Sequence, residues 1–318
     1  MTTYVLRRLL LVIPTVFIMS TIIFFAVRFI PGDIIDIMMS EMGESASPDA
    51  RANLERALGL DVPIYVQYGR WIENLFLHGD LGESIRGNVT VSKAITDRLP
   101  VTLELGILAI VVGLLISFPI GIYSGIRQDT IGDYIARSFA IACIALPSFW
   151  IGVMVMVFPS IWWGWSPNPA YIPFMQDPPG NLAQFIIPAV ILGMAFCGVN
   201  MRMIRTMILE VLRQDYIRTA WAKGLRERVV VTRHALKNAL IPVITIIGLQ
   251  MPVMIGGAVI IEQIFCLPGI GRLTIEAATQ RDYPVLVGIV LVFSVAVLII
   301  NLIVDLTYGF LDPRVRYR

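Results

Sequence analysis

Charged residues are scarce in this chain of 318 residues. Only 15% of them are Asp, Glu, Lys or Arg, whereas 57% are hydrophobic. A soluble domain carries about 25% charged and about 45–50% apolar residues. This balance excludes an ordinary soluble globular protein, because so many apolar side chains have to face lipid.

Cysteine and histidine are also rare. The three cysteines, Cys143, Cys197 and Cys266, are isolated in the sequence, and none forms a metal-type pair. The two histidines, His78 and His234, fall in loops that we expect on opposite sides of a membrane. Packing cysteines and surface histidines are therefore the expected interpretation, and no metal site is predicted.

Motifs for nucleotide binding and catalysis are missing. The sequence has no G-x-x-x-x-G-K-[ST] loop and no G-x-G-x-x-G loop, so it cannot bind ATP by a known loop chemistry. It also lacks H-E-x-x-H, G-x-S-x-G and a pair of carboxylates placed in a cleft. We therefore predict no catalytic residues, no enzyme activity and no cofactor.

Long apolar runs are abundant. A transmembrane helix needs about 20 apolar residues to cross about 30 Å of hydrocarbon. The first run is too long for a signal-peptide core of about 7–15 residues, and no cleavage site follows it. It is therefore predicted to be an uncleaved helix. We predict an all-α integral membrane protein with six spans: Leu9–Val27, Leu105–Ile126, Ser138–Trp165, Asn181–Met201, Ala239–Ile261 and Tyr283–Val304.

The distribution of basic residues predicts the orientation. The side that holds the N-terminus carries 16 of the 25 basic residues. Lys and Arg are enriched in cytoplasmic loops, so both termini are predicted to be cytoplasmic, in a multi-pass protein of the plasma or inner membrane.

The predicted organisation has three parts. Residues 1–30 hold the N-terminus and first span, residues 31–100 form an extracytoplasmic helical insert, and residues 101–318 form the transmembrane core. Within the insert, helices are predicted from Pro48 to a stop at Gly59, from Pro63 onward, and over Val91–Leu99. The insert is interpreted either as a cap that packs on the bundle or as a docking platform for an external partner.

Ionisable residues are missing from the middle of the spans. A charge there is costly and marks an ion or proton path. The residues that come near, Arg28, Glu104, Glu262 and Asp305, all lie at span ends. This argues against the alternative functions of channel or ion-driven carrier, and indicates that the energy for any transport comes from elsewhere. A sensor or scaffold is a third interpretation.

Uncharged polar residues do occur within the spans. Ser148, Asn200 and Gln250 are candidates for a translocation path. Hydrogen bonds between helices are the simpler interpretation of each.

A basic, glycine-interrupted segment, 202–238, separates the fourth and fifth spans. Its first part is predicted to continue the fourth span as a helix, and Gly224 to permit a tight bend before a second helical stretch. The pattern alone fits a basic helix lying on the inner leaflet as well as a surface that docks to a soluble partner. The candidate residues are Asp215, Tyr216, Arg218, Thr219, Ala220, Trp221, Lys223, Gly224 and Leu225.

Residues Asp215–Leu225, followed by His234–Pro242, resemble the coupling loop of binding-protein-dependent ABC importer permeases. Ala220 and Gly224 match the second Ala and the Gly of the family pattern E-A-A-x-x-x-G, whereas Arg218 and Thr219 stand where that pattern has Glu and its first Ala. Further matches to the dipeptide/oligopeptide/nickel group, first-permease (B) type, follow in order at Leu6–Leu10, Leu58–Pro63, Gly79–Ser84, Arg98–Leu105, Gly256–Glu262, Pro268–Gly271, Arg281–Pro284 and Asp312–Arg314.

This resemblance implies a type I ABC importer permease fold and a subunit that forms half of a translocation pathway for peptides or similar solutes. It implies four kinds of partner: a second, homologous permease subunit, two cytoplasmic ATPase subunits, an extracytoplasmic substrate-binding protein and membrane lipid. A nucleic-acid partner is not expected. Dipeptides, oligopeptides, nickel complexes, glutathione and oligosaccharides all remain open as substrates.

Overall fold

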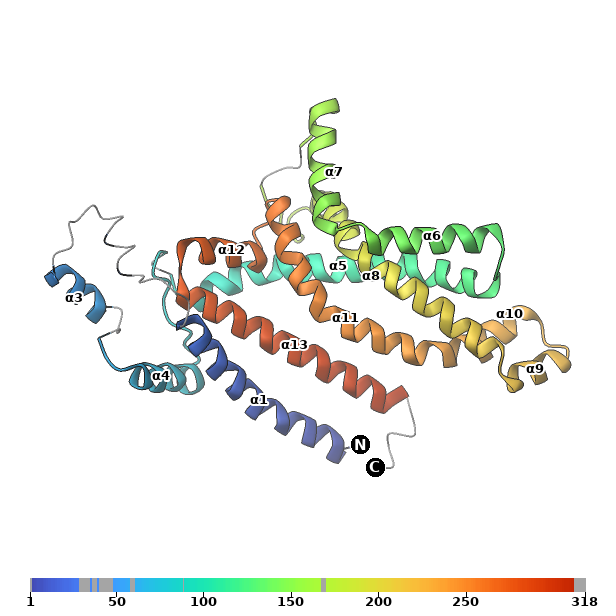
Figure 1. Ribbon diagram of the computed structural model, residues 1–318, viewed down its shortest axis with the longest axis horizontal. Coiled ribbons are helices and arrows are strands. Elements are labelled where there is room, and N and C mark those ends of the chain that lie inside the picture. The colour runs from blue at the N-terminus through green and yellow to red at the C-terminus, as the bar shows by residue number, and fades with distance from the viewer. Residues whose placement is uncertain are drawn as a thin grey trace. The chain divides into compact units, whose positions relative to one another are not determined.

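The protein is helical throughout the residues that the computed structural model describes, which are 2–28, 35, 39, 48–57, 61–87, 89–166 and 170–311 (Figure 1). The one β-bridge in these residues is an isolated antiparallel bridge between Glu83 and Thr90. The all-α prediction is confirmed for this part of the chain. The predicted stop at Gly59, the boundary at residues 30 and 31, and the tail 312–318 lie outside the described residues.

The chain folds into two compact units, each made of segments that are separated in the sequence. One unit comprises Met1–Val12, Arg98–Leu273 and Ala296–Arg318, and the other comprises Ile13–Asp97 and Thr274–Val295. The elements are α1 (Thr2–Arg28), α3 (Pro48–Ala57), α4 (Ile64–Glu73), π-helical turn η1 (Asn74–His78), α5 (Val91–Ile126), α6 (Ile131–Ala145), α7 (Ser148–Trp163), α8 (Pro178–Leu212), α9 (Asp215–Ala222), α10 (Glu227–Val229), π-helical turn η2 (Val230–Ala235), α11 (Leu236–Ile264), α12 (Ile270–Gln280) and α13 (Tyr283–Leu311).

Four of the predicted spans coincide with helices that are long and apolar enough to cross a membrane on their own. These helices are Val91–Ile126, Pro178–Leu212, Glu227–Ile264 and Tyr283–Val304. Helices α6 and α7 together make a fifth candidate. The apolar stretch of α1, Leu10–Ala26, is shorter. The described residues therefore hold four or five candidate spans by length and composition.

The third predicted span, Ser138–Trp165, is broken in the structure. Helices α6 and α7 meet at an angle of 91°, and α7 projects away from α6 (Figure 1). Proline crowds the backbone of the residue before it and disfavours the helical conformation there. Leu146, which precedes Pro147, accordingly adopts an extended conformation with φ −84° and ψ 120°. The sequence prediction contained no break at this point.

The second predicted span begins earlier than expected. Residues Val91–Leu99, predicted as a short helix leading into the second span, are the first turns of the 36-residue helix α5. Pro100 and Pro119 both lie inside this helix. Proline within a membrane helix is tolerated where neighbouring groups satisfy the freed carbonyls, so neither residue divides α5.

Helix α8 is the centre of the first unit. It packs against α6, α7 and α11, and its buried side chains include Phe185, Ile204 and Ile208. The crossings with α5 and α6 are close because glycine lines them. A Cβ added at Gly193 would lie 2.6 Å from the carbonyl oxygen of Ala109 on α5. Small residues at such crossings let membrane helices approach and gain van der Waals contact.

A buried acid ties α5, α11 and α12 together within the same unit. Glu262, near the end of α11, is fully buried. Its carboxylate accepts hydrogen bonds from the Thr102 hydroxyl at 2.7 Å and from the Arg272 backbone N–H at 3.1 Å. The acid predicted at a span end is thus satisfied by donors on two other elements.

In the second unit, α4 packs against the later part of α1. The rings of Phe24 and Trp71 lie 5.3 Å apart, and those of Phe24 and Tyr68 lie 5.4 Å apart. The hydroxyls of Thr21 and Tyr68 are 2.7 Å apart and share a hydrogen bond. This part of the predicted insert therefore packs on the apolar helix α1, while the docking-platform interpretation stays a prediction.

We expect Gly198→Ala to destabilise the protein by about 1–3 kcal/mol, the usual cost of overpacking. The new Cβ would lie 2.6 Å from the Ala140 carbonyl oxygen and 3.0 Å from Cys143 Cβ, so α6 and α8 would have to separate. The matched control is Gly106→Ala on α5, where nothing lies within 4 Å. The control should gain up to about 1 kcal/mol from helix propensity. Thermal unfolding in detergent measures both, and equal midpoints would contradict the close crossing.

Candidate functional site

Residues 213–235, here called the hairpin, connect α8 to α11. The helix α8 ends at Leu212, and Gln214 takes an extended conformation with ψ 149° before α9 begins at Asp215. The predicted continuation of the fourth span as a helix is present up to Leu212, whereas the break at Gln214 was not predicted. Asp215 lies in the first turn of α9, where a negative charge favours the helix dipole.

Gly224 ends α9 as expected from its sequence. Its φ of 76° is left-handed, a conformation that L side chains rarely adopt. The Gly224 N–H donates to the Trp221 carbonyl at 2.9 Å, and the Leu225 N–H donates to the Ala220 carbonyl at 3.4 Å. These two bonds form a Schellman motif, which satisfies the last carbonyls of the helix and reverses the chain. The bend predicted at this glycine is therefore present.

One face of α9 is buried inside the hairpin. Ile217 is fully buried and Ala220 is 6% exposed, and both pack with Val230 and Ala235 of η2. The spacing of three residues puts Ile217 and Ala220 on the same face of the helix. Ala220, a candidate contact residue in the sequence, therefore faces the interior of the hairpin, where its side chain packs on η2.

The other face of α9 is exposed. A hydrogen bond of 2.8 Å from Asn238 on α11 to the Tyr216 hydroxyl holds one of its aromatic residues in place. Trp221 is 43% exposed, and Arg218 forms an ion pair with the neighbouring Asp215, at 3.3 Å. The exposed candidates are Asp215, Tyr216, Arg218, Thr219, Trp221, Lys223, Gly224 and Leu225. Aromatic residues and arginine exposed together are typical of protein interfaces.

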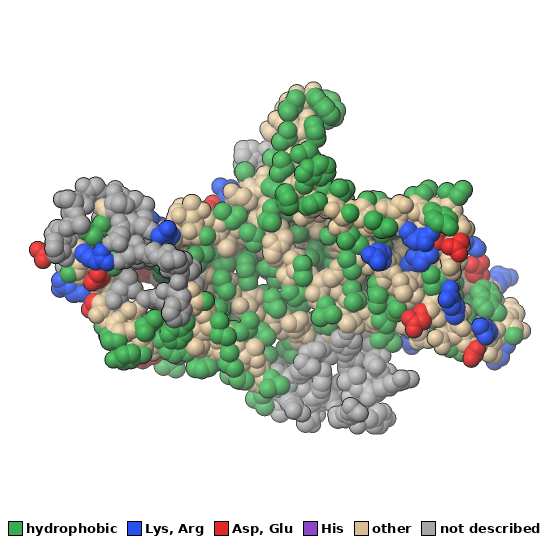
Figure 2. Space-filling view, viewed as in Figure 1, with side chains coloured by type: hydrophobic (Ala, Val, Ile, Leu, Met, Phe, Trp, Pro, Cys, Tyr) green, Lys and Arg blue, Asp and Glu red, His purple; other side chains and the backbone are tan. Residues whose placement is uncertain are grey.

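Charged side chains gather around this hairpin. In Figure 2 they lie over α9, α10 and the turn between α5 and α6, whereas the surface of α7 is largely hydrophobic. The apolar surface fits lipid, and the charged end fits water. The hairpin is thus a polar, folded element at one end of apolar helices.

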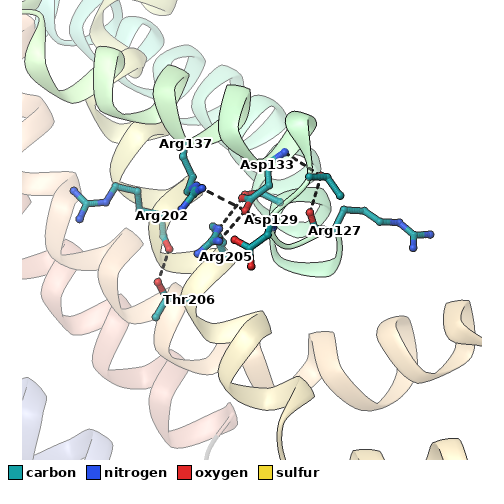
Figure 3. Close-up of polar contacts among 9 residues, drawn as sticks. Arg127, Asp129, Asp133, Arg137, Arg202, Arg205 and Thr206 are labelled. Atoms are coloured by element: carbon teal, nitrogen blue, oxygen red, sulfur yellow. Dashed lines mark hydrogen bonds and ion pairs between the residues drawn. The ribbon is translucent and has the colours of Figure 1, made fainter.

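A buried ion cluster lies beside the hairpin (Figure 3). Asp133 of α6 is fully buried, and Arg205 of α8 reaches it with two hydrogen bonds, Nε to Oδ1 at 2.8 Å and Nη2 to Oδ2 at 2.9 Å. The hydroxyl of Ser124 on α5 and the backbone N–H of Asp129 also donate to this carboxylate. Arg137 lies farther away, at 3.7 Å. The role of this acid could not be predicted from the sequence, because its partner Arg205 lies 72 positions away along the chain.

The turn between α5 and α6, residues 127–130, links this cluster to the hairpin. The side chain of Arg127 points away from Asp133 (Figure 3) and forms an ion pair of 3.5 Å with Glu227 of α10. Both partners are about half exposed, with side-chain exposures of 56% and 46%. An exposed pair of this kind contributes about 0–1 kcal/mol, so it is a weak contact next to the buried one.

The three path candidates are not joined by any hydrogen bond within the described part of the chain. Ser148 is the half-buried first residue of α7, at the bend. Asn200 is fully buried and donates to the Phe196 carbonyl of its own helix at 2.8 Å. Gln250 donates to the Ile246 carbonyl, again within its helix, at 3.2 Å. The interhelical bonds expected for Asn200 and Gln250 are thus replaced by bonds within one helix.

A family comparison matches both parts of the chain. Residues 117–317 match the family described as binding-protein-dependent transport system inner membrane component, and residues 1–106 match the N-terminal region of such membrane components. The chain belongs to this family. It is a multi-pass membrane protein of a transport system, in agreement with its apolar helices.

Two relatives match the chain over its whole length. The dipeptide transport system permease protein DppB of Escherichia coli is 39% identical over 339 residues, covering 99% of both chains. The dipeptide transport system permease protein DppB of Alkalihalophilus pseudofirmus is 38% identical over 342 residues, covering 100% of both chains. The family member described here therefore spans the full length of these permeases.

Two solved structures share the fold. An amino acid ABC transporter gives a TM-score of 0.54 at 16% identity, covering 69% of this chain and 94% of the other. The MetNI methionine ABC transporter in an inward-facing conformation gives a TM-score of 0.54 at 15% identity, covering 70% of this chain and 97% of the other. The helical arrangement is that of ABC transporter membrane subunits.

We expect Gly224→Ala to loosen the hairpin. A left-handed residue other than glycine costs about 1–2 kcal/mol, and nothing lies within 4 Å of the new Cβ, so the cost is one of backbone conformation. Amide hydrogen exchange in α9 should become faster by roughly 5–30-fold, the factor that corresponds to this free energy. Gly224→Asn should have a smaller effect, because Asn tolerates this conformation better. Identical exchange in all three proteins would rule out the strained bend.

Proposed function

We propose that this chain is the permease subunit of an ATP-driven importer of dipeptides or oligopeptides, and forms half of the translocation pathway. The observation that carries this proposal is its full-length similarity to permeases named for dipeptide transport. The scarcity of ionisable groups within the spans supports an external energy source, since ion-driven carriers need such groups. Hydrolysis of ATP then takes place on separate subunits.

We further propose that the hairpin is the element that docks to an ATPase subunit. Its support is the exposed surface formed by Tyr216, Arg218 and Trp221 of α9. Lys223, the C-cap of this helix, adds to that surface, and the buried face of α9 packs on η2. The buried Ala220 serves this role indirectly, because its small side chain lets α9 pack on η2. Arg218 and Lys223 offer positive charge to acidic groups of a partner.

The proposed topology has six spans with both termini in the cytoplasm. It counts α1 as the first span and the bent pair of α6 and α7 as the third, and it places residues 31–100 outside the membrane, where a substrate-binding protein would dock. The positive charge around the hairpin supports its cytoplasmic location. A second homologous permease, two ATPase subunits and membrane lipid complete the proposed set of partners.

Among the path candidates, Ser148 has the position that best fits contact with a passing solute. It begins α7 directly after the bend, where the chain leaves regular helix at Leu146 and Pro147. Irregular backbone at membrane depth is tolerated where it is buried in protein or lines a water-filled cavity. Asn200 and Gln250 remain weaker candidates, because their amide groups bond to their own helices.

Reconstitution tests the proposed function. The chain is expressed together with candidate permease, ATPase and binding-protein subunits, purified in mild detergent, and placed in vesicles with ATP and a radiolabelled dipeptide. We expect a second permease and ATPase subunits to co-purify in a fixed stoichiometry, and uptake to require ATP and a binding protein. Flux that persists without any ATPase subunit would contradict the proposal and favour a channel.

Charge reversal on the hairpin tests the docking surface. Lys223→Glu should reduce both ATPase retention and uptake by at least about tenfold, which corresponds to 1.4 kcal/mol of lost binding. The side chain is exposed, so the fold should be unaffected. Lys93→Glu, an exposed lysine in the first turn of α5, is the matched control and should behave like the unmodified protein. Equal ATPase retention and equal uptake in the two variants would contradict the assigned docking surface.

A further inference from the structure

The ion cluster around Asp133 contains more than the ion pair with Arg205, because donors from other elements also bind this carboxylate. Donors to the one carboxylate come from α5 (Ser124), from the turn (the Asp129 N–H) and from α8 (Arg205). Desolvating a charge pair offsets most of the attraction between its members, so a buried pair is a poor device for stability alone. Its effect is geometric, because a bidentate Arg–carboxylate contact fixes both distance and orientation.

The turn is shaped by the same carboxylate. Asp129 has a left-handed φ of 60°, which is uncommon for a residue other than glycine. This conformation directs its N–H to Asp133 Oδ2 at 3.0 Å, while Thr130 caps α6 by accepting from the Asp133 N–H at 3.3 Å. The end of α5, the turn, the start of α6 and the last third of α8 are therefore held as one body.

This body touches the hairpin at two points that differ in strength. Helix α8 runs directly into the hairpin through Arg213 and Gln214. The turn reaches it through the exposed pair of Arg127 and Glu227. At its far end, α6 leads through the 91° bend into α7, which packs on α8 and α11. A displacement of the hairpin can thus reach α7 by way of α6 as well as along α8.

We propose that Asp133 and Arg205 are positioning residues for coupling: their contact makes α6 follow α8, so that movement of the hairpin is passed to the bent pair of α6 and α7. The inference rests on the proposed ATP-driven import. It assigns to these two residues no contact with ATP or with the solute. Their role is to keep the start of α6 and the last third of α8 at a constant separation while the hairpin moves.

The first test is the number of peptides imported per ATP hydrolysed, measured in vesicles that hold the complete transporter and a radiolabelled dipeptide. In Asp133→Asn, uptake should fall more than hydrolysis, and the ratio should drop by at least about fivefold, the lower end of typical coupling between sites. Arg205→Lys keeps the charge but loses the bidentate fork, so it should lower the ratio in the same direction. It also serves as the second variant if Asp133→Asn does not fold.

The matched control is Leu105→Ala, which removes a fully buried side chain earlier on α5. This variant should be destabilised without touching the cluster, so uptake and hydrolysis should fall together with the amount of folded protein. A constant ratio in Asp133→Asn and Arg205→Lys, as in the control, would overturn the proposal and leave the pair with a structural role only.

A second readout does not depend on the solute. Spin labels at Ile141 on α6 and Thr206 on α8, both exposed, report the separation of the two helices, in a Cys266→Ser background because that cysteine is exposed. With Asp133 present, the separation should be the same without nucleotide and in an ATP-trapped state. In Asp133→Asn it should change on trapping, and an unchanged separation would overturn the inference. If no variant or parent protein imports the dipeptide, the proposed function fails on its own, while the labels still test the pair.

Discussion

The close approach of α8 to the helices around it is the constraint on which the rest of this structure depends. Between apolar helices in lipid, contact comes from packing rather than from the hydrophobic effect, so the helices associate where their backbones come near. Gly193 meets the carbonyl of Ala109, and Gly198 meets that of Ala140. These two glycines set where α5 and α6 lie along α8. That placement brings Arg205 to the start of α6, where the Asp133 carboxylate lies.

Polar contacts are few within these helices and occur where elements have to be fixed in orientation. Asp133 and Glu262 are both fully buried, and each accepts hydrogen bonds from donors on several elements. Because packing of apolar side chains leaves rotation and sliding weakly defined, a buried acid with fixed donors adds directional contacts that packing lacks. One such acid holds the start of α6, and the other holds the start of α12.

The sequence predicted the apolar helices well because their signal is local. Runs of apolar residues located α5, α8, α11 and α13, and Gly224 located the end of α9. The break at Leu146 and the early start of α5 were missed, since Pro147 ends a helix whereas Pro100 and Pro119 lie inside one. Proline is tolerated inside a membrane helix where neighbouring groups satisfy the freed carbonyls, and spacing along the chain does not reveal those neighbours. The pairing of Asp133 with Arg205 was equally hidden, because it follows from the crossing of α6 and α8 rather than from spacing along the chain.

The structure also gives a physical meaning to the pattern E-A-A-x-x-x-G that the hairpin resembles. Its second Ala is Ala220, which is buried against Val230 and Ala235, and its Gly is Gly224, which needs a left-handed φ. Both positions are thus explained by the folding of the hairpin itself, with no partner needed. Arg218 and Thr219, where this chain departs from the pattern, are exposed on the opposite face. In the proposed docking to an ATPase subunit, the exposed departures would contact the partner, while the matched residues preserve the shape of the hairpin.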